Sequence, residues 1–188
     1  TWNEAAPCNI ALMRQAQSVK KGVRANGGTP REFCTITVTD GIAMGHEGMK
    51  ASLISREVIA DSAELTVRGH CYDALVGIAG CDKSLPALMM AMVRLNVPSV
   101  FIYGGSILPG RYKGKDVTVV DVFEAVGKHS SGQMSAAELR KLELVACPSA
   151  GACGGQFTAN TMACVSEAIG LALPYSAGTP APYEERDK

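Results

Sequence analysis

Two short apolar runs constrain the fold more than any other feature of this 188-residue chain. They cover residues 73–79 and 99–103, and a glycine follows each of them. Continuous apolar runs of this length are typical of strands that are buried on both faces of a parallel sheet. Between them, residues 85–95 have the length and composition of a helix. The order strand, helix, strand indicates two parallel strands joined by a crossover helix.

A third strand is expected earlier in the chain, at residues 33–38, where apolar and polar side chains alternate. Glycine-rich loops, a long loop before Asp116 and a polar tail that frays at residues 181–188 complete the expected pattern. Hydrophobic periodicity and stop signals predict helices at residues 9–25, 49–67, 119–128, from about 135, and 157–173. This alternation predicts an α/β fold, a three-layer sandwich with a mainly parallel sheet flanked by helices on both faces.

Length and composition indicate one domain spanning residues 1–188, with 47% apolar residues to form its core. Eighteen basic residues balance eighteen acidic ones, so we expect no nucleic-acid partner and no membrane partner. No apolar run reaches the roughly 20 residues of a membrane-spanning helix. Seven scattered cysteines favour a reducing compartment. We therefore expect a small-molecule partner and a location in the cytoplasm if the protein is bacterial, or in mitochondria or plastids if it is eukaryotic.

Polar and glycine residues follow all three predicted strands. Asp40 comes after the first, Cys81, Asp82 and Lys83 after the second, and Gly104–Gly105 after the third. In open parallel sheets, ligands bind in the crevice at the carboxyl ends of the strands. These residues are therefore expected to line one crevice.

Three of the seven cysteines, Cys8, Cys81 and Cys153, lie in predicted turns, whereas Cys34 lies in a predicted strand and Cys164 in a predicted helix. Three thiolates in one crevice would suit an iron–sulfur cluster with one iron left open to substrate or water. Their spacing alone leaves the alternative that they are small buried apolar residues. The N-terminus of the helix expected after Cys153 would stabilise a thiolate there.

Asp40 and Asp82 are oxygen ligands of the kind that Mg²⁺ prefers. Each could instead form a turn or cap, which aspartate does commonly. Lys83 could form an ion pair with Asp82. Alternatively, burial could make the amine neutral, so that it reacts with CO₂ to give a carbamate, which is an anionic metal ligand.

Longer motifs resemble the dihydroxy-acid/phosphogluconate dehydratase family over nearly the whole chain. They are Pro-Cys-Asn at 7–9, Thr-Asp-Gly-Ile-Ala-Met-Gly-His-Glu-Gly-Met at 39–49, Ser-Arg-Glu-Val-Ile-Ala-Asp-Ser at 55–62, Gly-Cys-Asp-Lys at 80–83, Cys-Pro at 147–148 and Gly-Ala-Cys-Gly-Gly-Gln-Phe-Thr-Ala-Asn-Thr-Met at 151–162. One departure is Gln156, where the family commonly has methionine.

The resemblance implies an iron–sulfur cluster, [2Fe–2S] rather than [4Fe–4S], and a Mg²⁺ ion. The implied cluster ligands are Cys8, Cys81 and Cys153, and the implied Mg²⁺ ligands are Asp40, Asp82 and a carbamylated Lys83. The serine base and a glutamate ligand of the family belong to a C-terminal domain that has no counterpart in this sequence. We therefore expect this chain to be inactive alone, and the full-length protein to be a homodimer.

The implied activity is that of a hydro-lyase, which dehydrates 2,3-dihydroxy-3-methyl acids such as 2,3-dihydroxyisovalerate to 2-keto acids in the biosynthesis of valine and isoleucine. Residues 100–110 and 120–127 most resemble this branch of the family. One alternative is a dehydratase of sugar acids, either aldonates or 6-phosphogluconate. Another is an α/β module without enzymatic activity that binds an anion at its glycine loops.

Overall fold

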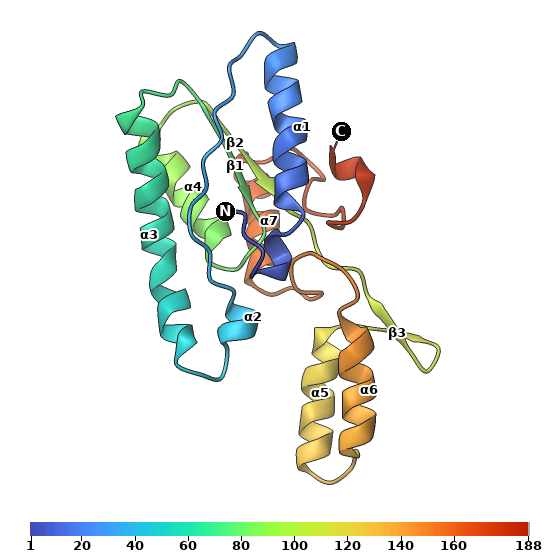
Figure 1. The fold of residues 1–188 in the computed structure, drawn as a ribbon. Helices are drawn as coiled ribbons and strands as arrows, with labels where there is room; N and C mark the ends of the chain where they lie inside the picture. The colour runs from blue at the N-terminus through green and yellow to red at the C-terminus, as the bar shows by residue number, and fades with distance from the viewer. Residues whose placement is uncertain (188) are drawn as a thin grey trace.

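The structure, a computed structural model, describes residues 1–187. Its centre is a parallel pair of strands, β1 (Leu75–Ala79) and β2 (Ser99–Tyr103), paired from the first residue of each strand to the last. The crossover between them is α4 (Ser84–Leu95) (Figure 1). The expected strand–helix–strand unit is therefore confirmed.

Helix α4 forms much of the core because most of its residues are apolar and buried. It ends at Asn96, whose backbone has a φ of 51° and whose N–H donates to the Met92 carbonyl at 3.0 Å. The long helix α3 (Gly48–Gly69) packs beside it through small residues such as Ala60 and Ala63, both fully buried. Close packing of these two helices fixes one side of the parallel unit.

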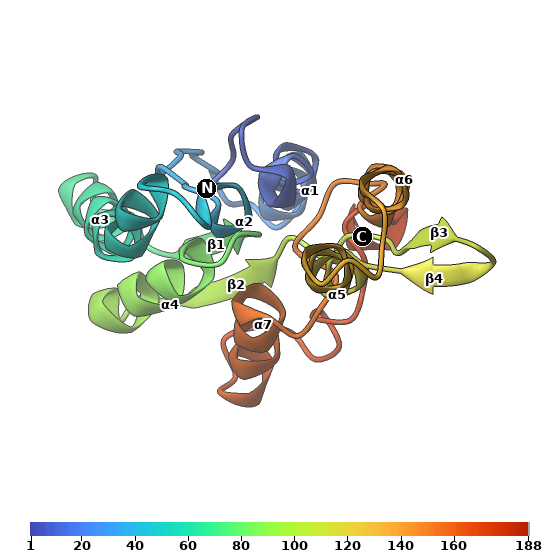
Figure 2. The same cartoon turned by 90° about the horizontal axis from the view of Figure 1, so that it is seen from below.

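Helices cover both faces of the strand pair. Figure 2 shows α1 (Leu12–Ala25) and the one-turn helix α2 (Asp40–Ala43) on one side of the strands, and α4 and α7 (Thr158–Ala168) on the other. The arrangement confirms the predicted α/β sandwich, built here on a short sheet. Within residues 1–187, no helix is both long enough and apolar enough to cross a membrane.

The expected helix over residues 157–173 is too long, because α7 ends at Ala168. Gly170 has a φ of 77°, a left-handed conformation that terminates a helix. The chain then turns back along β2, where the Phe101 N–H donates to the Leu171 carbonyl at 2.7 Å. Phe101 also forms a parallel bridge with Ala172, which extends the sheet beyond β2.

The prediction of a strand at residues 33–38 is wrong. The segment is extended and its burial alternates, with Phe33 half-buried and Cys34 exposed, but it forms no strand ladder. Its polar contacts go to side chains instead: the Thr37 carbonyl accepts from Nδ2 of Asn3 at 3.1 Å. An alternating pattern reports an extended chain with one buried side, and it does not reveal whether a neighbouring strand is present.

Part of the long loop expected before Asp116 is instead a β-hairpin of β3 (Gly110–Tyr112) and β4 (Lys115–Val117). Its two turn residues, Lys113 and Gly114, have φ values of 48° and 79°. Positive φ at both central residues is the requirement of the tight hairpin turn that matches strand twist. The adjacent residues Lys113 and Gly114 are the sequence feature that indicates this turn.

The hairpin leads into α5 (Val119–Ser130) and α6 (Ala136–Ala146), which pack together and project from the body of the molecule (Figure 1). Thr118 caps α5: its hydroxyl accepts from the Val120 N–H at 3.3 Å, and its own N–H donates to Asp121 at 2.7 Å. A second small core lies inside this projection, made of Val117, Ala125, Leu142 and Ala146.

The polar tail does not fray over the residues that the structure describes, while residue 188 lies outside them. The one-turn helix η2 (Glu184–Asp187) is held by Arg186, whose guanidinium donates to the carbonyls of Tyr103, Ser176 and Thr179 at 2.5, 2.7 and 2.5 Å. One side chain therefore ties the tail to the end of β2.

Candidate metal centre

The backbone segments that carry the three turn cysteines are in contact. Cys8 lies in the short helix η1 (Pro7–Asn9), whose first carbonyl accepts from the Gly151 N–H at 3.1 Å. A side chain at Gly80 would collide with the Cys8 carbonyl. Gly80 precedes Cys81, and Gly151 precedes the Cys153 loop, so the structure brings the surroundings of all three cysteines to one place.

The sulfur atoms of these cysteines influence one another. Interaction with the Cys81 thiol, together with burial, raises the pKa of Cys8. The same interaction lowers the pKa of Cys81 to about 7, against the effect of burial. The charges of Cys81 and Cys153 also act on Cys8. Cys81 is thus the thiol that ionises first, with Cys8 beside it.

The expected stabilisation of a Cys153 thiolate by the following helix is wrong. Burial raises the pKa of Cys153, and the nearby thiols of Cys81 and Cys147 raise it further. Helix α7 begins at Thr158, and Cys153 lies in the loop that leads into it, as the sequence predicted.

The carboxylates of Asp40 and Asp82 are joined by the ammonium of Lys83. Nζ of Lys83 lies 2.9 Å from Oδ2 of Asp40 and 2.5 Å from Oδ2 of Asp82. The three side chains are only 17%, 13% and 16% exposed, in the order Lys83, Asp40, Asp82. The sequence predicted that residues following two of the expected strands lie together at one site. Asp40, Asp82 and Lys83 do so.

The two aspartates have different environments. Burial raises the pKa of Asp40, and the neighbouring Asp82 carboxyl adds to this shift, although hydrogen bonds from Ser52 and Lys83 oppose it. Burial acts on Asp82 in the same direction, but its interactions with Asp40, Lys83 and the Thr158 hydroxyl outweigh burial and lower its pKa. Asp82 therefore carries the negative charge more readily than Asp40.

Lys83 is held as an ammonium. Burial lowers its pKa, but the hydrogen bonds to Asp82 and Asp40 outweigh that effect and raise the pKa above its ordinary value. With these two carboxylates as partners, burial does not make the amine neutral, and the carbamate on Lys83 stays a prediction. Any reaction of Lys83 with CO₂ must first displace two ion pairs.

The donor atoms fit two separate inorganic groups better than one ion. Within residues 1–187, no three His, Cys, Asp or Glu side chains surround a single point as ligands of one metal ion would. The two irons of a [2Fe–2S] cluster take two terminal ligands each, so three cysteine thiolates divide between two irons and do not all surround one metal ion. Soft sulfur donors and hard oxygen donors are also grouped separately here, as iron–sulfur and Mg²⁺ chemistry require.

Three hydroxyl-bearing residues of the site were missed by sequence reasoning. The Ser52 hydroxyl, on α3, donates to Oδ1 of Asp40. Thr158 contributes to the low pKa of Asp82, and Thr39 to that of Cys81. A single serine or threonine in a helix or before one is ordinarily a cap or a surface residue, so these roles have no signal in the sequence.

Gly104–Gly105, expected to line the same crevice, are used for packing instead. A side chain at Gly104 would meet Leu12, and one at Gly105 would meet Ala181 and Arg186. These glycines therefore let the tail and α1 approach β2, and the anion-binding role considered for them has no geometric support.

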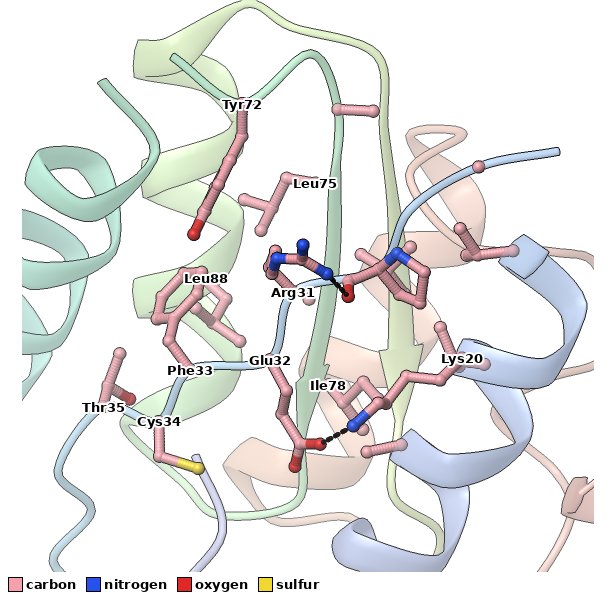
Figure 3. Close-up of a pocket in the computed structure, with 18 of the residues that line it drawn as sticks. Lys20, Arg31, Glu32, Phe33, Cys34, Thr35, Tyr72, Leu75, Ile78 and Leu88 are labelled. Carbon is pink, nitrogen blue, oxygen red and sulfur yellow. Dashed lines mark hydrogen bonds and ion pairs between the residues drawn. The ribbon is translucent and has the colours of Figure 1, made fainter. Parts of the chain in front are cut away.

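A cavity of about 400 Å³ lies elsewhere, between α1, β1 and the extended segment near Phe33. Figure 3 shows Phe33, Leu75, Ile78 and Leu88 around it, with Lys20 and Glu32 forming an ion pair. Cys34 and Cys71 line this cavity, but none of the six predicted site residues does. The cavity and the candidate metal centre are therefore distinct.

The whole chain is similar to known proteins. A family model described as dihydroxy-acid/6-phosphogluconate dehydratase N-terminal matches residues 1–188. A dihydroxy-acid dehydratase of Pelagibacter ubique is 96% identical over the full chain, which covers 33% of that protein. Proteins with the same name from Parvibaculum lavamentivorans and Metallosphaera sedula are 84% and 57% identical over the full chain, which covers 32% and 34% of them.

The chain thus spans about a third of the length of the curated relatives that it matches. The site residues inferred from sequence, Cys8, Cys81, Cys153, Asp40, Asp82 and Lys83, all lie within the matched region. Because the family model matches every residue, the chain belongs to the dihydroxy-acid/6-phosphogluconate dehydratase family and corresponds to its N-terminal part.

Proposed function

We propose that this chain forms the cofactor-binding part of a hydro-lyase that converts a 2,3-dihydroxy-3-methyl acid, of the 2,3-dihydroxyisovalerate type, into a 2-keto acid in branched-chain amino-acid biosynthesis. One observation carries the proposal. A group of three thiols and a separate group of two carboxylates with a lysine both form around the segment 81–83 at the end of β1. Relatives that are 79–96% identical are named dihydroxy-acid dehydratases, which supports this branch of the family.

Cys8, Cys81 and Cys153 would hold an iron–sulfur cluster, which we propose to be [2Fe–2S] rather than [4Fe–4S]. Three protein thiolates leave one coordination position free, and a Lewis-acidic iron there would assist departure of the C3 hydroxyl group. Cys8 and Cys81 are buried, so they would hold the group away from solvent, while Cys153, the most exposed of the three, would lie on the substrate side.

Asp40 and Asp82 would hold Mg²⁺, with a carbamate on Lys83 as the third oxygen ligand. The two carboxylates lie within hydrogen-bond reach of one Nζ atom, so their oxygens already face a common cationic group. A divalent cation there would replace the ammonium as their partner, so that Lys83 could lose a proton to solvent, and the free amine could then add CO₂ to give the carbamate with release of a second proton. Ser52 would keep Asp40 in place during this exchange, because its hydroxyl donates to the carboxylate oxygen that Lys83 does not use.

We further propose that the catalytic base and a further metal ligand come from the part of the protein outside these residues. This chain alone would then bind its cofactors without turnover. The complete protein would act as a homodimer in the cytoplasm, and its substrate would be a small dihydroxy acid. Eighteen acidic and eighteen basic residues leave no excess charge that would favour nucleic acid.

Anaerobic purification of the protein expressed from its complete gene tests the proposal. We expect a brown protein with iron, inorganic sulfide and visible absorbance, and dehydration of 2,3-dihydroxyisovalerate at a higher kcat/KM than of aldonates or 6-phosphogluconate. Preference for a sugar acid would move the protein to the other branch of the family. A colourless protein that takes up no iron after reconstitution would refute the dehydratase and favour an anion-binding module.

Isotope labelling tests the carbamate separately. With ¹³C-bicarbonate and Mg²⁺ present, we expect a carbamate carbon resonance that disappears in Lys83→Arg, because the guanidinium does not form a carbamate under these conditions. Lys113→Arg is the matched control, since Lys113 is exposed and paired with Glu138. A resonance that persists in Lys83→Arg, or none in the unmodified protein, would contradict this assignment.

A further inference from the structure

Cys153 lies in a loop, so its position depends on the contacts that hold the loop. On its N-terminal side, the Ala152 N–H donates to the Gly105 carbonyl at 2.9 Å, and the Ala152 carbonyl accepts from the Ile107 N–H at 2.7 Å. These backbone bonds attach the chain before Cys153 to the continuation of β2. After Cys153 come two glycines, Gly154–Gly155, whose backbone is intrinsically flexible. The C-terminal side of the cysteine therefore needs another support.

Asn160, in the first turn of α7, supplies that support. Its amide Nδ2 donates to the Cys153 carbonyl at 2.9 Å and also to the Gly155 carbonyl. The Gly155 N–H donates to the same Cys153 carbonyl at 2.9 Å. One side-chain amide thus closes the turn that carries the cysteine.

Tyr103 determines which way this amide faces. Its hydroxyl donates to Oδ1 of Asn160, which leaves Nδ2 directed at the loop. Tyr103 is 0% exposed, and its carbonyl is held by Arg186, whose guanidinium carbon also lies 5.3 Å from the centre of the tyrosine ring. Burial raises the pKa of Tyr103, so its hydroxyl is a donor at neutral pH. A fixed phenol at the end of β2 therefore orients an amide on α7.

We propose that Tyr103 and Asn160 are positioning residues for Cys153: the phenol orients the amide, and the amide holds the Cys153 carbonyl so that the thiol remains beside Cys8 and Cys81. The effect of these residues on a bound cluster rests on the proposed function, whereas the hydrogen bonds from Tyr103 to Asn160 and from Asn160 to the Cys153 carbonyl do not. The competing explanation is that Tyr103 fills the core and that Asn160 serves only to begin α7.

Two conservative variants break the chain at different points. Tyr103→Phe removes one hydroxyl and keeps the ring. Asn160→Asp keeps the shape but replaces two N–H donors by an oxygen that faces two carbonyls. Matched controls are Tyr72→Phe, which alters a tyrosine stacked on His70 at the opposite end of β1, and Asn26→Asp, which alters an amide that donates to a carbonyl at the end of α1.

The first measurement uses the whole protein without its cluster and follows alkylation of each cysteine by mass spectrometry. We expect Cys153 to react several-fold faster in Tyr103→Phe and Asn160→Asp, because the loop leaves its fixed position. Cys34, in the separate cavity, should react at the rate of the unmodified protein, and both control variants should leave Cys153 unchanged. Equal Cys153 rates in all five proteins would overturn the proposal.

The second measurement uses the reconstituted whole protein under anaerobic conditions. We expect Tyr103→Phe and Asn160→Asp to change the electron paramagnetic resonance spectrum and the midpoint potential of the bound cluster, and to bleach several-fold faster in air. A role in folding alone would lower the unfolding midpoint and the iron content, but it would leave the spectrum of the loaded fraction unaltered. That result would overturn positioning.

The two measurements separate failure of this inference from failure of the proposed function. If the unmodified protein takes up neither iron nor sulfide, the proposed dehydratase function fails. The alkylation rates then decide alone whether Tyr103 and Asn160 hold Cys153 in place.

Discussion

The backbone of Gly80 lies against the backbone of Cys8: a Cβ built on Gly80 would be 2.1 Å from the Cys8 carbonyl oxygen and 3.0 Å from Oδ1 of Asn9. No real side chain tolerates the first of these distances. This contact is what places η1 at the carboxyl end of β1, and with it the buried Cys8 thiol beside Cys81. The absence of a side chain at one position thus allows two distant segments to form the metal centre.

Gly80→Ala is therefore expected to impair both folding and cofactor binding. The new methyl group collides with backbone, which cannot move aside as a flexible side chain would, so we expect a loss of about 1–3 kcal/mol in the free energy of unfolding, as for overpacking in a core. Iron content after anaerobic reconstitution should fall as well. Denaturant titration and iron analysis of the whole protein measure the two effects.

Gly127→Ala is the control, because it lies exposed within α5 and a Cβ there meets nothing within 4 Å. It should stabilise the protein slightly, by about 0.5–1 kcal/mol, since alanine is the better helix former. Equal stability and equal iron content in Gly80→Ala and the unmodified protein would show that the two segments do not touch.

The parts of the fold that could be predicted are those with a strong local pattern. The apolar runs at β1 and β2 and the helix between them could be identified because apolar residues follow one another along these segments, although within each strand buried residues alternate with partly exposed ones. Alternation in residues 33–38 was misleading, since it reports one buried side and not a hydrogen-bonded neighbour. The prediction that the tail frays was wrong because the polar composition of the tail does not show that Arg186 donates to three backbone carbonyls.

The candidate site was predictable for a different reason. The sequence pattern alone left two interpretations of its cysteines open, as cluster ligands or as small buried apolar residues. The resemblance to a family selected Cys8, Cys81 and Cys153 as the ligands. Its supporting contacts were not predictable, because Ser52 and Asn160 are ordinary helix residues in sequence. Their roles follow only from which helices pack against the site.

Arg186→Met is expected to destabilise the protein substantially. Three backbone carbonyls lose a charged donor, and each hydrogen bond to a charged group is worth about 1.5–3 kcal/mol, so with partial exposure a total loss of roughly 2–4 kcal/mol follows. Arg111→Met is the matched control: its ion pair with Asp116 is 69% and 66% exposed and should contribute no more than about 1 kcal/mol. Similar unfolding midpoints for the two variants would contradict the anchoring role.

Lys113→Met is expected to have a pH-dependent effect on the hairpin and α6. Lys113 lies 3.1 Å from Glu138, and its hydrogen bond lowers the pKa of that carboxyl. A group with a lowered pKa stabilises the fold above its ordinary pKa and loses this contribution as the pH falls. The difference in melting temperature between Lys113→Met and the unmodified protein should therefore be present at neutral pH and vanish in acid.

Lys115→Met provides the comparison for this pH series, because Lys115 is on the same hairpin and forms no ion pair among residues 1–187. Its melting temperature should follow that of the unmodified protein at every pH. A Lys113→Met difference that stays constant down to acid pH would mean that the ion pair with Glu138 does not stabilise the hairpin.

Ser52→Ala is expected to weaken Mg²⁺ binding without unfolding the protein. The fully buried Ser52 hydroxyl donates to Asp40, and loss of such a contact to a metal ligand typically lowers affinity by about tenfold or more. Ser55→Ala is a closely matched control: Ser55 is also buried on α3, but its hydroxyl donates to the Ser52 carbonyl at 2.7 Å and does not contact Asp40. Titration calorimetry with Mg²⁺ on the whole protein compares them.

Because both substitutions remove one buried hydroxyl from the same helix, a general loss of stability affects both, and only a contact with the metal ligand separates their affinities. Equal Mg²⁺ affinities for Ser52→Ala and Ser55→Ala would therefore remove Asp40 from the proposed cation site.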